Sequence, residues 1–209
     1  MLATESGIAG LAGALPDGVT VYVARGDVIR TVVGYPFHRG CLAIGERGED
    51  LHVDALRAGR RVVVLDRLAN PDNVGGVFRS AMALGVDGVL LTPGCADPLY
   101  RRAIRVSMGG TLRVPFAPLP AWPEELHSLR DAGFTVIALT PDGGTDVAEF
   151  GVTRTVPARV ALVLGAEGDG VGPEARAAAD LVVAIRMAAG DHSLNVATAA
   201  GIALHRLRR

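Results

Sequence analysis

The stretch VALVLGAEGDGVGPEARAAAD, residues 160–180, contains an apolar run, a glycine-rich loop and an alanine-rich segment in direct succession. The run VALVLG is continuous in Val, Leu and Ala, as expected for a strand that is covered on both faces. Pro173 suits the first position of a helix, where the N–H that proline lacks would have no intrahelical partner. The stretch therefore predicts a strand–loop–helix unit.

The same alternation extends over the chain from residue 61 onward. Apolar runs predict strands over 61–66, 88–92, 134–140, 159–165 and 181–187, and helical segments lie between them over 73–85, 97–108, 123–133, 173–180 and 193–209. This order predicts an α/β fold with a mostly parallel sheet flanked by helices. In such folds the ligand chemistry lies at the carboxyl ends of the strands.

The first 55 residues have a different character. They hold short extended pieces, VTVYVA and CLAIGE, between turn-rich segments, and residues 54–60 resemble a connector. A segment of this size is marginal as an independent domain.

Composition limits the class of protein. The chain has 209 residues, 49% hydrophobic and 21% charged, which favours a packed core. It has no apolar run of about 20 residues and no basic N-terminal start, so we expect a soluble cytoplasmic protein with no membrane association. The two cysteines and five histidines have no metal-ligand spacing, and we expect no metal.

The glycine-rich loop fails as a phosphate cradle. Gly168 and Gly170 match the first two glycines of G-x-G-x-x-G, but Pro173 occupies the third position. The chain contains no lysine, which excludes a Walker-type loop. Glu167, directly after a predicted buried strand, is then the notable side chain, and the other glycines are expected to supply turn geometry.

Two further strand ends carry polar side chains. NPDNVGGVFRSAMALG predicts a helix beginning near Asn73, in which Gly75 and Arg79 share a face and the glycine leaves space beneath the guanidinium. We expect its buried stripe to consist of Val74, Val77, Ala81 and Leu84.

The last strand leads into AAGDHSLNVATAAGIAL. Asp191 and Ser193 are candidate N-caps there, with Asn195 in the first helical turn. Such residues cap helices more often than they act in chemistry, and both interpretations remain open.

Together, NPDNVGGVFRSAMALG, LVLGAEGDGVGPE and IRMAAGDHSLNVATAAGIAL resemble the three motifs of the SpoU (TrmH) family of RNA ribose 2′-O-methyltransferases, in the SPOUT superfamily. The resemblance covers residues 61–209, and VSMGGTLRVPF (106–116) is similar to the segment that joins the first motif to the later ones. Arg186 departs from the pattern, because the family usually has proline there.

The resemblance also implies domains and assembly. FHRGCLAIGE (37–46) is similar to the end of the family's N-terminal RNA-recognition domain of ribosomal-protein type, here shortened at its start. We therefore expect a partial α+β substrate-binding segment over 1–57 and a catalytic domain over 58–209. The catalytic domain would contain a C-terminal deep trefoil knot and form a homodimer through it.

The resemblance implies methyl transfer from S-adenosylmethionine to a ribose 2′-OH of ribosomal RNA or, failing that, transfer RNA. Its catalytic positions fall on Arg79, Asn73, Glu167, Ser193 and Asn195. Its cofactor positions fall on Leu139, Thr140, Leu164, Gly165, Ile185, Met187 and Leu194. Gly165 would let the backbone approach the cofactor, and Glu167 would fix Arg79 or the partner loop. Since guanidinium is essentially never deprotonated, we favour Arg79 as a charge-assisted donor over a general base.

RNA contacts need a local source of charge, because the net charge is −1. Arg101, Arg102 and Arg105 lie on or near one predicted helix face and form either an RNA-binding patch or a solvated surface. The aromatic content of 4% argues against wide base stacking and fits recognition of folded RNA by shape and backbone.

Two other functions stay open. A non-catalytic RNA-binding protein of the same fold would fit the short N-terminal segment and the mildly acidic pI. A nucleotide-dependent oxidoreductase depends on the glycine loop alone, and Pro173 disfavours it.

Overall fold

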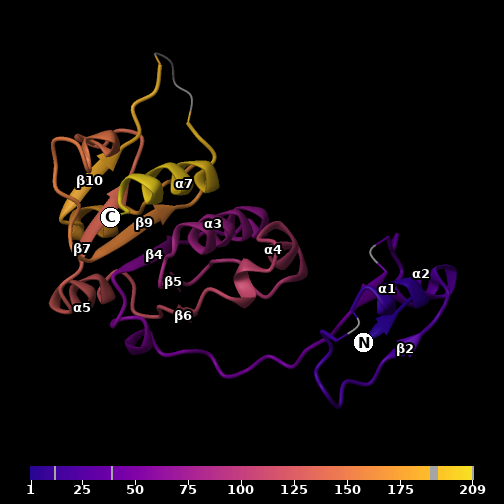
Figure 1. Cartoon of the computed structure of the whole chain (residues 1–209). Helices are drawn as coiled ribbons and strands as arrows, with labels where there is room; N and C mark the ends of the chain where they lie inside the picture. Colours follow the sequence, from indigo (N-terminus) through magenta and orange to yellow (C-terminus); the bar gives the residue numbers. More distant parts are fainter. Residues whose placement is uncertain (12, 39, 189–192, 209) are drawn as a thin grey trace. The chain divides into compact units, whose positions relative to one another are not determined.

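The computed structural model describes residues 1–11, 13–38, 40–188 and 193–208. The chain divides into two compact units, Met1–Glu49 and Asp50–Arg209. Helices and strands of both units are labelled in Figure 1.

The second unit is built on a sheet with the strand order β6-β5-β4-β9-β7-β10-β8, in which every neighbouring pair is parallel. The strands are β4 (Arg61–Asp66), β5 (Gly88–Leu91), β6 (Phe116–Pro118), β7 (Thr135–Leu139), β8 (Thr145–Asp146), β9 (Val160–Gly165) and β10 (Leu181–Ala184). The predicted parallel α/β sheet is confirmed. The pattern missed β6 and β8, two short strands at the sheet edges whose runs are too brief to give a periodic signal.

The helices of this unit follow the predicted order. They are α3 (Pro71–Leu84), α4 (Arg101–Val106), α5 (Glu125–Asp131), α6 (Pro173–Ala178) and α7 (Val196–Arg206), with 3₁₀ turns η1 (Val53–Ala55), η2 (Gly110–Leu112) and η3 (Val147–Glu149). α3 begins two residues before Asn73, because Asn70 is its N-cap and accepts a hydrogen bond from the Asp72 N–H.

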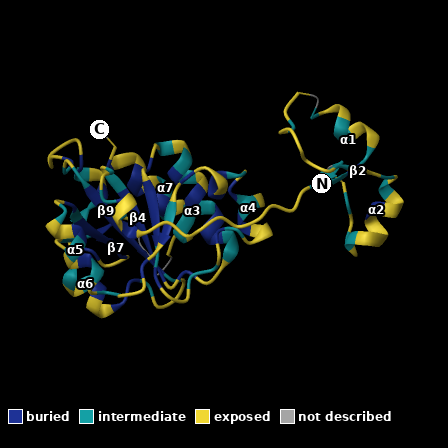
Figure 2. Cartoon of the chain, turned by 90° about the horizontal axis from the view of Figure 1, so that it is seen from below, coloured by how far each residue is buried: buried dark blue, intermediate teal, exposed yellow. Residues whose placement is uncertain are grey.

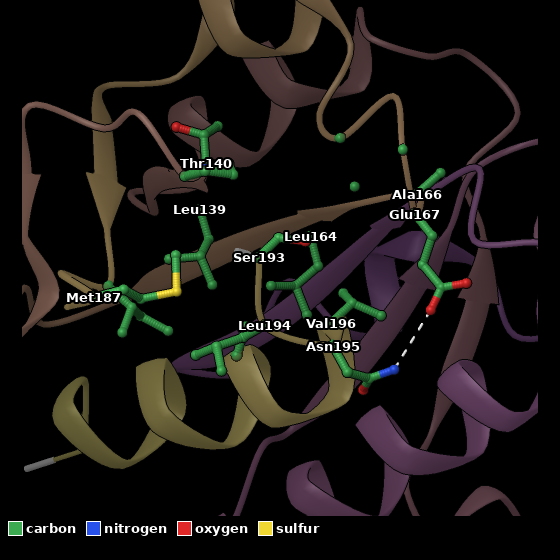
Figure 3. Close-up of a pocket in the computed structure, with 16 residues that line it drawn as sticks. Leu139, Thr140, Leu164, Ala166, Glu167, Met187, Ser193, Leu194, Asn195 and Val196 are labelled. Carbon is green, nitrogen blue, oxygen red and sulfur yellow. Dashed lines mark hydrogen bonds between the residues drawn. The ribbon is translucent and has the colours of Figure 1, made fainter. Parts of the chain in front are cut away.

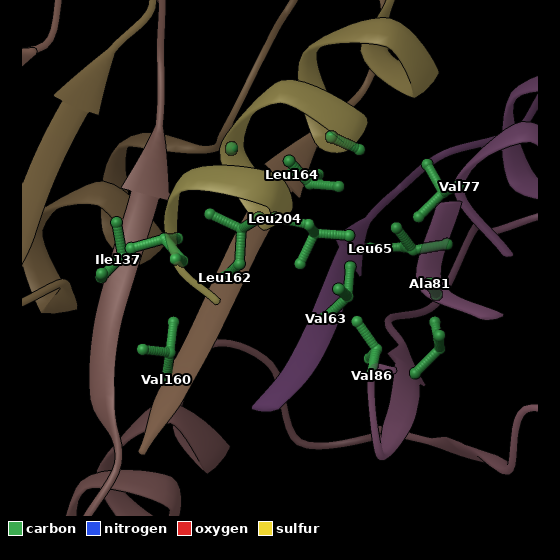
Figure 4. Packing of buried hydrophobic residues seen from close by; sticks show 14 of the residues in the cluster. Val63, Leu65, Val77, Ala81, Val86, Ile137, Val160, Leu162, Leu164 and Leu204 are labelled. Carbon is green, nitrogen blue, oxygen red and sulfur yellow. The ribbon is translucent and has the colours of Figure 1, made fainter. Parts of the chain in front are cut away.

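Helices cover both faces of the sheet, and each face has its own apolar core. Val63 and Leu65 point toward α3 and α7, whereas Val62 and Val64 point toward α5 and α6. Figure 4 shows Leu65, Leu162 and Leu164 packed against Leu204 of α7 and Val77 of α3. In Figure 2 the strands are mostly dark blue between helices whose outer faces are exposed. Burial of each large aliphatic side chain contributes about 1.5–3 kcal/mol.

The second unit starts earlier than the predicted boundary between residues 57 and 58. Val53 and Leu56, around η1, are buried in the core that α5 and α6 cover, and they attach residues 50–57 to this unit. The connector predicted over residues 54–60 contains Leu56 as its one large apolar side chain, and it gave no sign of this packing in the sequence.

The first unit is small. A three-stranded sheet, ordered β2-β1-β3, joins β1 (Leu2–Ala3), β2 (Tyr22–Val23) and β3 (Cys41–Leu42), with α1 (Glu5–Ala9) and α2 (Gly26–Val33) beside it. β2 and β3 fall within the two predicted extended pieces but hold only two residues each. Among the described residues, Ala3 and Ile29 are the buried apolar side chains of this unit. No helix in the described parts of the chain is long and apolar enough to span a membrane.

Candidate active site

A cavity of about 400 Å³ opens at the carboxyl ends of β7, β9 and β10 (Figure 3). Its size lies within the range of roughly 300–1,000 Å³ common for small-molecule sites. It is lined by Leu139, Thr140, Pro141, Leu164, Gly165, Ala166, Glu167, Gly168, Gly170, Ile185, Met187, Ser193, Leu194, Asn195, Val196 and Ala199. All seven cofactor positions named from the sequence are among these residues.

The walls combine aliphatic side chains with one buried hydroxyl. Thr140 is the first residue after β7, and its Oγ1 is buried with no hydrogen-bond partner among the described residues. The pKa of the neighbouring Asp142 carboxyl is lowered mainly by hydrogen bonds from Arg176 and, to a smaller extent, by the Thr140 hydroxyl. The Thr140–Asp142 geometry nevertheless falls short of a hydrogen bond, so this buried oxygen retains capacity for a bound ligand.

The glycine-rich loop after β9 folds back over the end of its own strand. A side chain at Gly165 would collide with the backbone of Gly170 and Val171, with a closest approach of about 2 Å. Gly165 therefore admits the protein's own loop. Since Gly165 also lines the cavity, the approach of its backbone to a cofactor stays a prediction. Gly168 and Gly170 adopt positive φ angles of 89° and 66°, in agreement with their expected role in turn geometry.

Asp66 fastens this loop to the sheet. It is the last residue of β4 and fully buried, and its Oδ2 accepts a hydrogen bond of 2.8 Å from the Gly172 N–H. Its Oδ1 accepts from Arg67 Nε at 3.2 Å. A buried carboxylate is costly unless it is paired, so these contacts hold the loop in one position. Asp66 was not among the site residues predicted from the sequence, although its position at the end of a predicted strand could have indicated a role at this edge of the sheet.

Three side chains from separate motifs meet at the edge of the cavity. Asn73 Nδ2 donates to Glu167 Oε1 at 2.5 Å, and Asn195 Nδ2 donates to Asn73 Oδ1 at 2.8 Å and to Glu167 Oε1 at 3.4 Å. This closed ring, here called the Asn–Glu–Asn cluster, joins residues up to 122 positions apart in the sequence. Glu167 Oε2 has no hydrogen bond to any described residue and is left to accept one from a ligand.

The cap of α7 determines how Asn195 is oriented. Asn195 is the N-cap itself, because its Oδ1 accepts a hydrogen bond of 2.9 Å from the Ala197 N–H. Its expected place within the first turn is wrong by one position. Capping directs the amide nitrogen toward Asn73 and Glu167, so the capping interpretation is confirmed and the functional one stays a prediction. Ser193 is exposed and lines the cavity, while Asp191 lies outside the described residues.

The paired glycines of α3 admit neighbouring helices. A side chain at Gly75 would lie 2.7 Å from the Ala103 carbonyl oxygen of α4, and one at Gly76 would lie 2.6 Å from the Ala197 Cβ of α7. The prediction that Gly75 leaves space beneath Arg79 is therefore wrong, because this glycine instead admits the Ala103 carbonyl. Of the predicted buried stripe, Val74, Val77 and Ala81 are fully buried and Leu84 is partly buried.

Arg79 lies on the exposed surface of α3, away from the cavity lining. It follows Asn73 by six residues, about 9 Å along a helix axis. Its guanidinium makes no hydrogen bond or ion pair with any other described residue, and Glu167 is bonded to the two asparagines instead of to Arg79. The guanidinium is thus available to a substrate at the surface.

The three arginines of α4 are exposed, but they differ in their partners. Arg102 donates from Nε and Nη2 to both carboxylate oxygens of Asp72, at 2.6 and 2.5 Å. These bonds and the charge of Asp72 raise the pKa of Arg102 above its ordinary value. The Arg105 guanidinium makes no hydrogen bond or ion pair with the other described residues.

Arg186, the departure from the family pattern, is exposed and donates to the Gly144 carbonyl oxygen at 3.4 Å. Its neighbours Ile185 and Met187 still line the cavity. The described residues include no group of three or more His, Cys, Asp or Glu side chains that could hold a metal ion.

Comparisons with known proteins agree with this geometry. A sequence model of the SpoU rRNA methylase family matches residues 60–205. An uncharacterized tRNA/rRNA methyltransferase of Mycobacterium bovis is 42% identical over 193 residues, which cover 92% of this chain and 67% of the relative. The chain belongs to the SpoU family of RNA methyltransferases.

Solved structures of RNA-modifying and SpoU methyltransferases share the fold. The methyltransferase AviRb from Streptomyces viridochromogenes, in complex with the cofactor AdoMet, superimposes with a TM-score of 0.81 at 23% identity, covering 99% of this chain and 80% of that one. An rRNA methyltransferase from Sinorhizobium meliloti gives a TM-score of 0.76 at 25% identity, covering 99% and 78% of the two chains.

Proposed function

We propose that this chain transfers a methyl group from S-adenosylmethionine to a ribose 2′-OH of RNA, with ribosomal RNA the favoured substrate over transfer RNA. The observation that carries the proposal is the Asn–Glu–Asn cluster, which lies at the edge of the cavity and beside the exposed face of α3. AdoMet-bound neighbours with this fold support the choice of cofactor.

The cavity suits the cofactor in size and in chemistry. Aliphatic side chains would pack against its apolar parts, and the buried Thr140 hydroxyl would bond one of its polar atoms. When bound, S-adenosylmethionine supplies a methyl carbon on a positively charged sulfur, to which the ribose oxygen bonds as the carbon–sulfur bond breaks. The enclosing loop 166–172 keeps water from that carbon, so much of the rate enhancement comes from positioning.

Arg79 and Glu167 would manage the charge and the proton of the ribose hydroxyl. The Arg79 guanidinium donates a charge-assisted hydrogen bond to the 2′-oxygen or the adjacent phosphate and stabilises negative charge as it develops. Glu167 Oε2 accepts a hydrogen bond from the hydroxyl, while Asn73 and Asn195 hold Oε1. The hydroxyl proton passes to this carboxylate or to solvent.

We also propose that the catalytic domain is knotted and that it forms a homodimer. A deep trefoil knot is supported by the insertion of β9 between β4 and β7 and by the close approach of the Gly143 and Val183 backbones. A homodimer formed through this region would act on RNA in the cytoplasm. Residues 1–57 would assist in substrate binding.

Replacement of Arg79 by alanine tests the proposed chemistry. We expect Arg79→Ala to lower the rate of methyl transfer about 10²–10³-fold, the usual cost of removing one donor to developing charge. Calorimetry should give an unchanged dissociation constant for S-adenosylmethionine, because Arg79 does not line the cavity. Arg60→Ala, an exposed arginine at the amino end of β4, is the matched control. Full activity of Arg79→Ala would contradict the mechanism.

A further inference from the structure

The segment between α3 and α5 contains a surface of unusual composition. Residues 98–123 include four arginines and no acidic residue. Tyr100, Met108 and Leu112 are large apolar side chains of this segment that are 58%, 64% and 64% exposed. Cationic and apolar side chains thus occur together in α4 and η2.

The arginines of this segment divide by their partners. Arg102 donates two hydrogen bonds to the Asp72 carboxylate of α3. The side chains of Arg105 and Arg113 are exposed and form no hydrogen bond or ion pair with any other described residue. Arg102 therefore attaches α4 to α3, whereas Arg105 and Arg113 are available to a partner.

α4 is held close to the helix that carries Asn73 and Arg79. Gly75 of α3 admits the Ala103 carbonyl to within 2.7 Å of its notional Cβ, and the Arg102–Asp72 pair links the starts of the two helices. Helices packed this closely lie about 8–10 Å apart. An RNA strand whose ribose lies at Arg79 would reach α4 within a few nucleotides.

We propose that Tyr100, Arg105, Met108, Leu112 and Arg113, here called the α4–η2 surface, bind unpaired nucleotides that flank the methylated ribose. Arg105 and Arg113 contact backbone phosphates, and the ring of Tyr100 stacks on a base. Arg102 links α4 to α3 through Asp72 and does not contact RNA. This inference rests on the proposed function and narrows its substrate to RNA with the target in a loop or single strand.

The chemistry of the surface favours unpaired RNA over other partners. The side chains of Arg105 and Arg113 have no acidic partner among the described residues, so they complement a polyanion. Phosphate contacts dominate the affinity of proteins for nucleic acids. The stacked bases of a duplex leave no face for an aromatic ring, whereas unpaired bases stack readily on tyrosine. One exposed tyrosine supports one stacked base, which is compatible with the low aromatic content.

Fluorescence anisotropy of the full chain with two labelled RNA probes tests the inference. The probes are a 20-nucleotide single strand and the corresponding 20-base-pair duplex, each titrated at several salt concentrations. We expect tighter binding of the single strand. Tyr100→Ala should weaken it about 5–150-fold, the range for one stacked base, and Tyr100→Phe should leave it unchanged.

The arginine pair gives a separate readout. Arg105→Gln combined with Arg113→Gln should reduce the slope of log K against log salt by about 1.4, or about 0.7 per lost phosphate contact on a single strand. Arg60→Gln should change neither affinity nor slope. Melting temperatures and S-adenosylmethionine affinity should match the unsubstituted protein in all variants, because none of these side chains lines the cavity.

Other results would distinguish failure of the α4–η2 surface from failure of the proposed function. If the unsubstituted protein methylates RNA while the Tyr100 and arginine variants bind and methylate normally, the α4–η2 surface is wrong and the proposed function stands. Equal affinity for duplex and single strand also overturns the inference. A change of sedimentation coefficient in the variants, with RNA affinity intact, would reassign the surface to contact between copies of the chain. Failure of the unsubstituted protein to methylate any RNA would overturn the proposed function itself.

Discussion

The two sides of the Asn–Glu–Asn cluster are built differently. On the cavity side, aliphatic walls and a loop fastened by Asp66 enclose a volume of about 400 Å³. On the side of α3 and α4, Arg79 and Arg105 project from exposed helix faces with no partners among the described residues. The enclosed side suits a small cofactor that must be shielded from water, and the open side suits a large substrate.

The cluster joins these two sides. Glu167 belongs to the loop over the cavity, Asn195 caps α7, and Asn73 lies in the first turns of α3. A change in this ring should therefore affect the transfer step more than the binding of either reactant alone. Substitutions in the cluster and on its cavity side can distinguish an effect on the transfer step from an effect on binding.

Among changes in the cluster and on its cavity side, the largest effect is expected from Asn195→Asp. Aspartate still caps α7, because its carboxylate accepts from the Ala197 N–H, so the melting temperature should change little. Its second oxygen would face Glu167 and Asn73 Oδ1 in place of a donor. We expect transfer to fall about 100-fold at neutral pH, equivalent to about 2.7 kcal/mol, because Oδ1 of the buried Asn73 would lose its donor, at a cost of about 1–3 kcal/mol.

Asn195→Ala is the paired variant for this experiment. It removes the cap as well and should lower stability by about 1 kcal/mol in a denaturant titration. Equal activity of Asn195→Asp and the unsubstituted chain would mean that the ring has no part in transfer.

A smaller effect is expected from Asp66→Asn, which loosens only the cavity side. The carboxamide oxygen can still accept from the Gly172 N–H, but the amide nitrogen cannot accept from Arg67. We expect about 1–2 kcal/mol of destabilisation and roughly tenfold weaker S-adenosylmethionine binding. RNA affinity, measured on the same preparation, should be unaltered. Weaker RNA binding without weaker cofactor binding would show that the two sides are not separate.

The smallest effect concerns Cys95, which lies behind the end of β4 and donates to the Leu65 carbonyl oxygen. Burial raises the pKa of this thiol above its ordinary value. The folded chain therefore keeps the proton at a pH where the unfolded chain has lost it. The contribution of the thiol to stability is fully present below about pH 8.5 and is lost as the pH rises through the folded pKa.

Alkylation gives a direct measurement of this difference. Iodoacetamide should modify Cys95 slowly at pH 8 in the folded protein and rapidly after denaturation. Fast modification of Cys95 in the folded state would indicate that the carboxyl ends of β4 and β5 are open to solvent.

The sequence predicted the cavity side well, for a physical reason. Its residues come from the ends of strands and from backbone-rich loops, and such positions follow directly from the order of strands in a parallel sheet. The family resemblance then named seven cofactor positions, and all seven line the cavity, including Leu139 and Met187.

Contacts between side chains were beyond the sequence. The Arg102–Asp72 pair joins residues 30 positions apart on two helices, and nothing in either helix shows which arginine is bound. The roles of Gly75 and Gly76 depend on how closely α4 and α7 approach α3. The strands β6 and β8 form because a sheet edge accepts them, not because their own two or three residues favour them.

The most direct test of the central claim is the position of the methyl group on the RNA. RNA treated with the protein and isotopically labelled S-adenosylmethionine would be digested to nucleosides and examined by mass spectrometry. We expect label on the ribose, seen as a 2′-O-methyl nucleoside after digestion. In the undigested RNA, the linkage 3′ of the modified nucleotide should resist alkali and lie at an unpaired position. Label on a base, or no transfer to any RNA from a protein that binds S-adenosylmethionine, would contradict the proposed function.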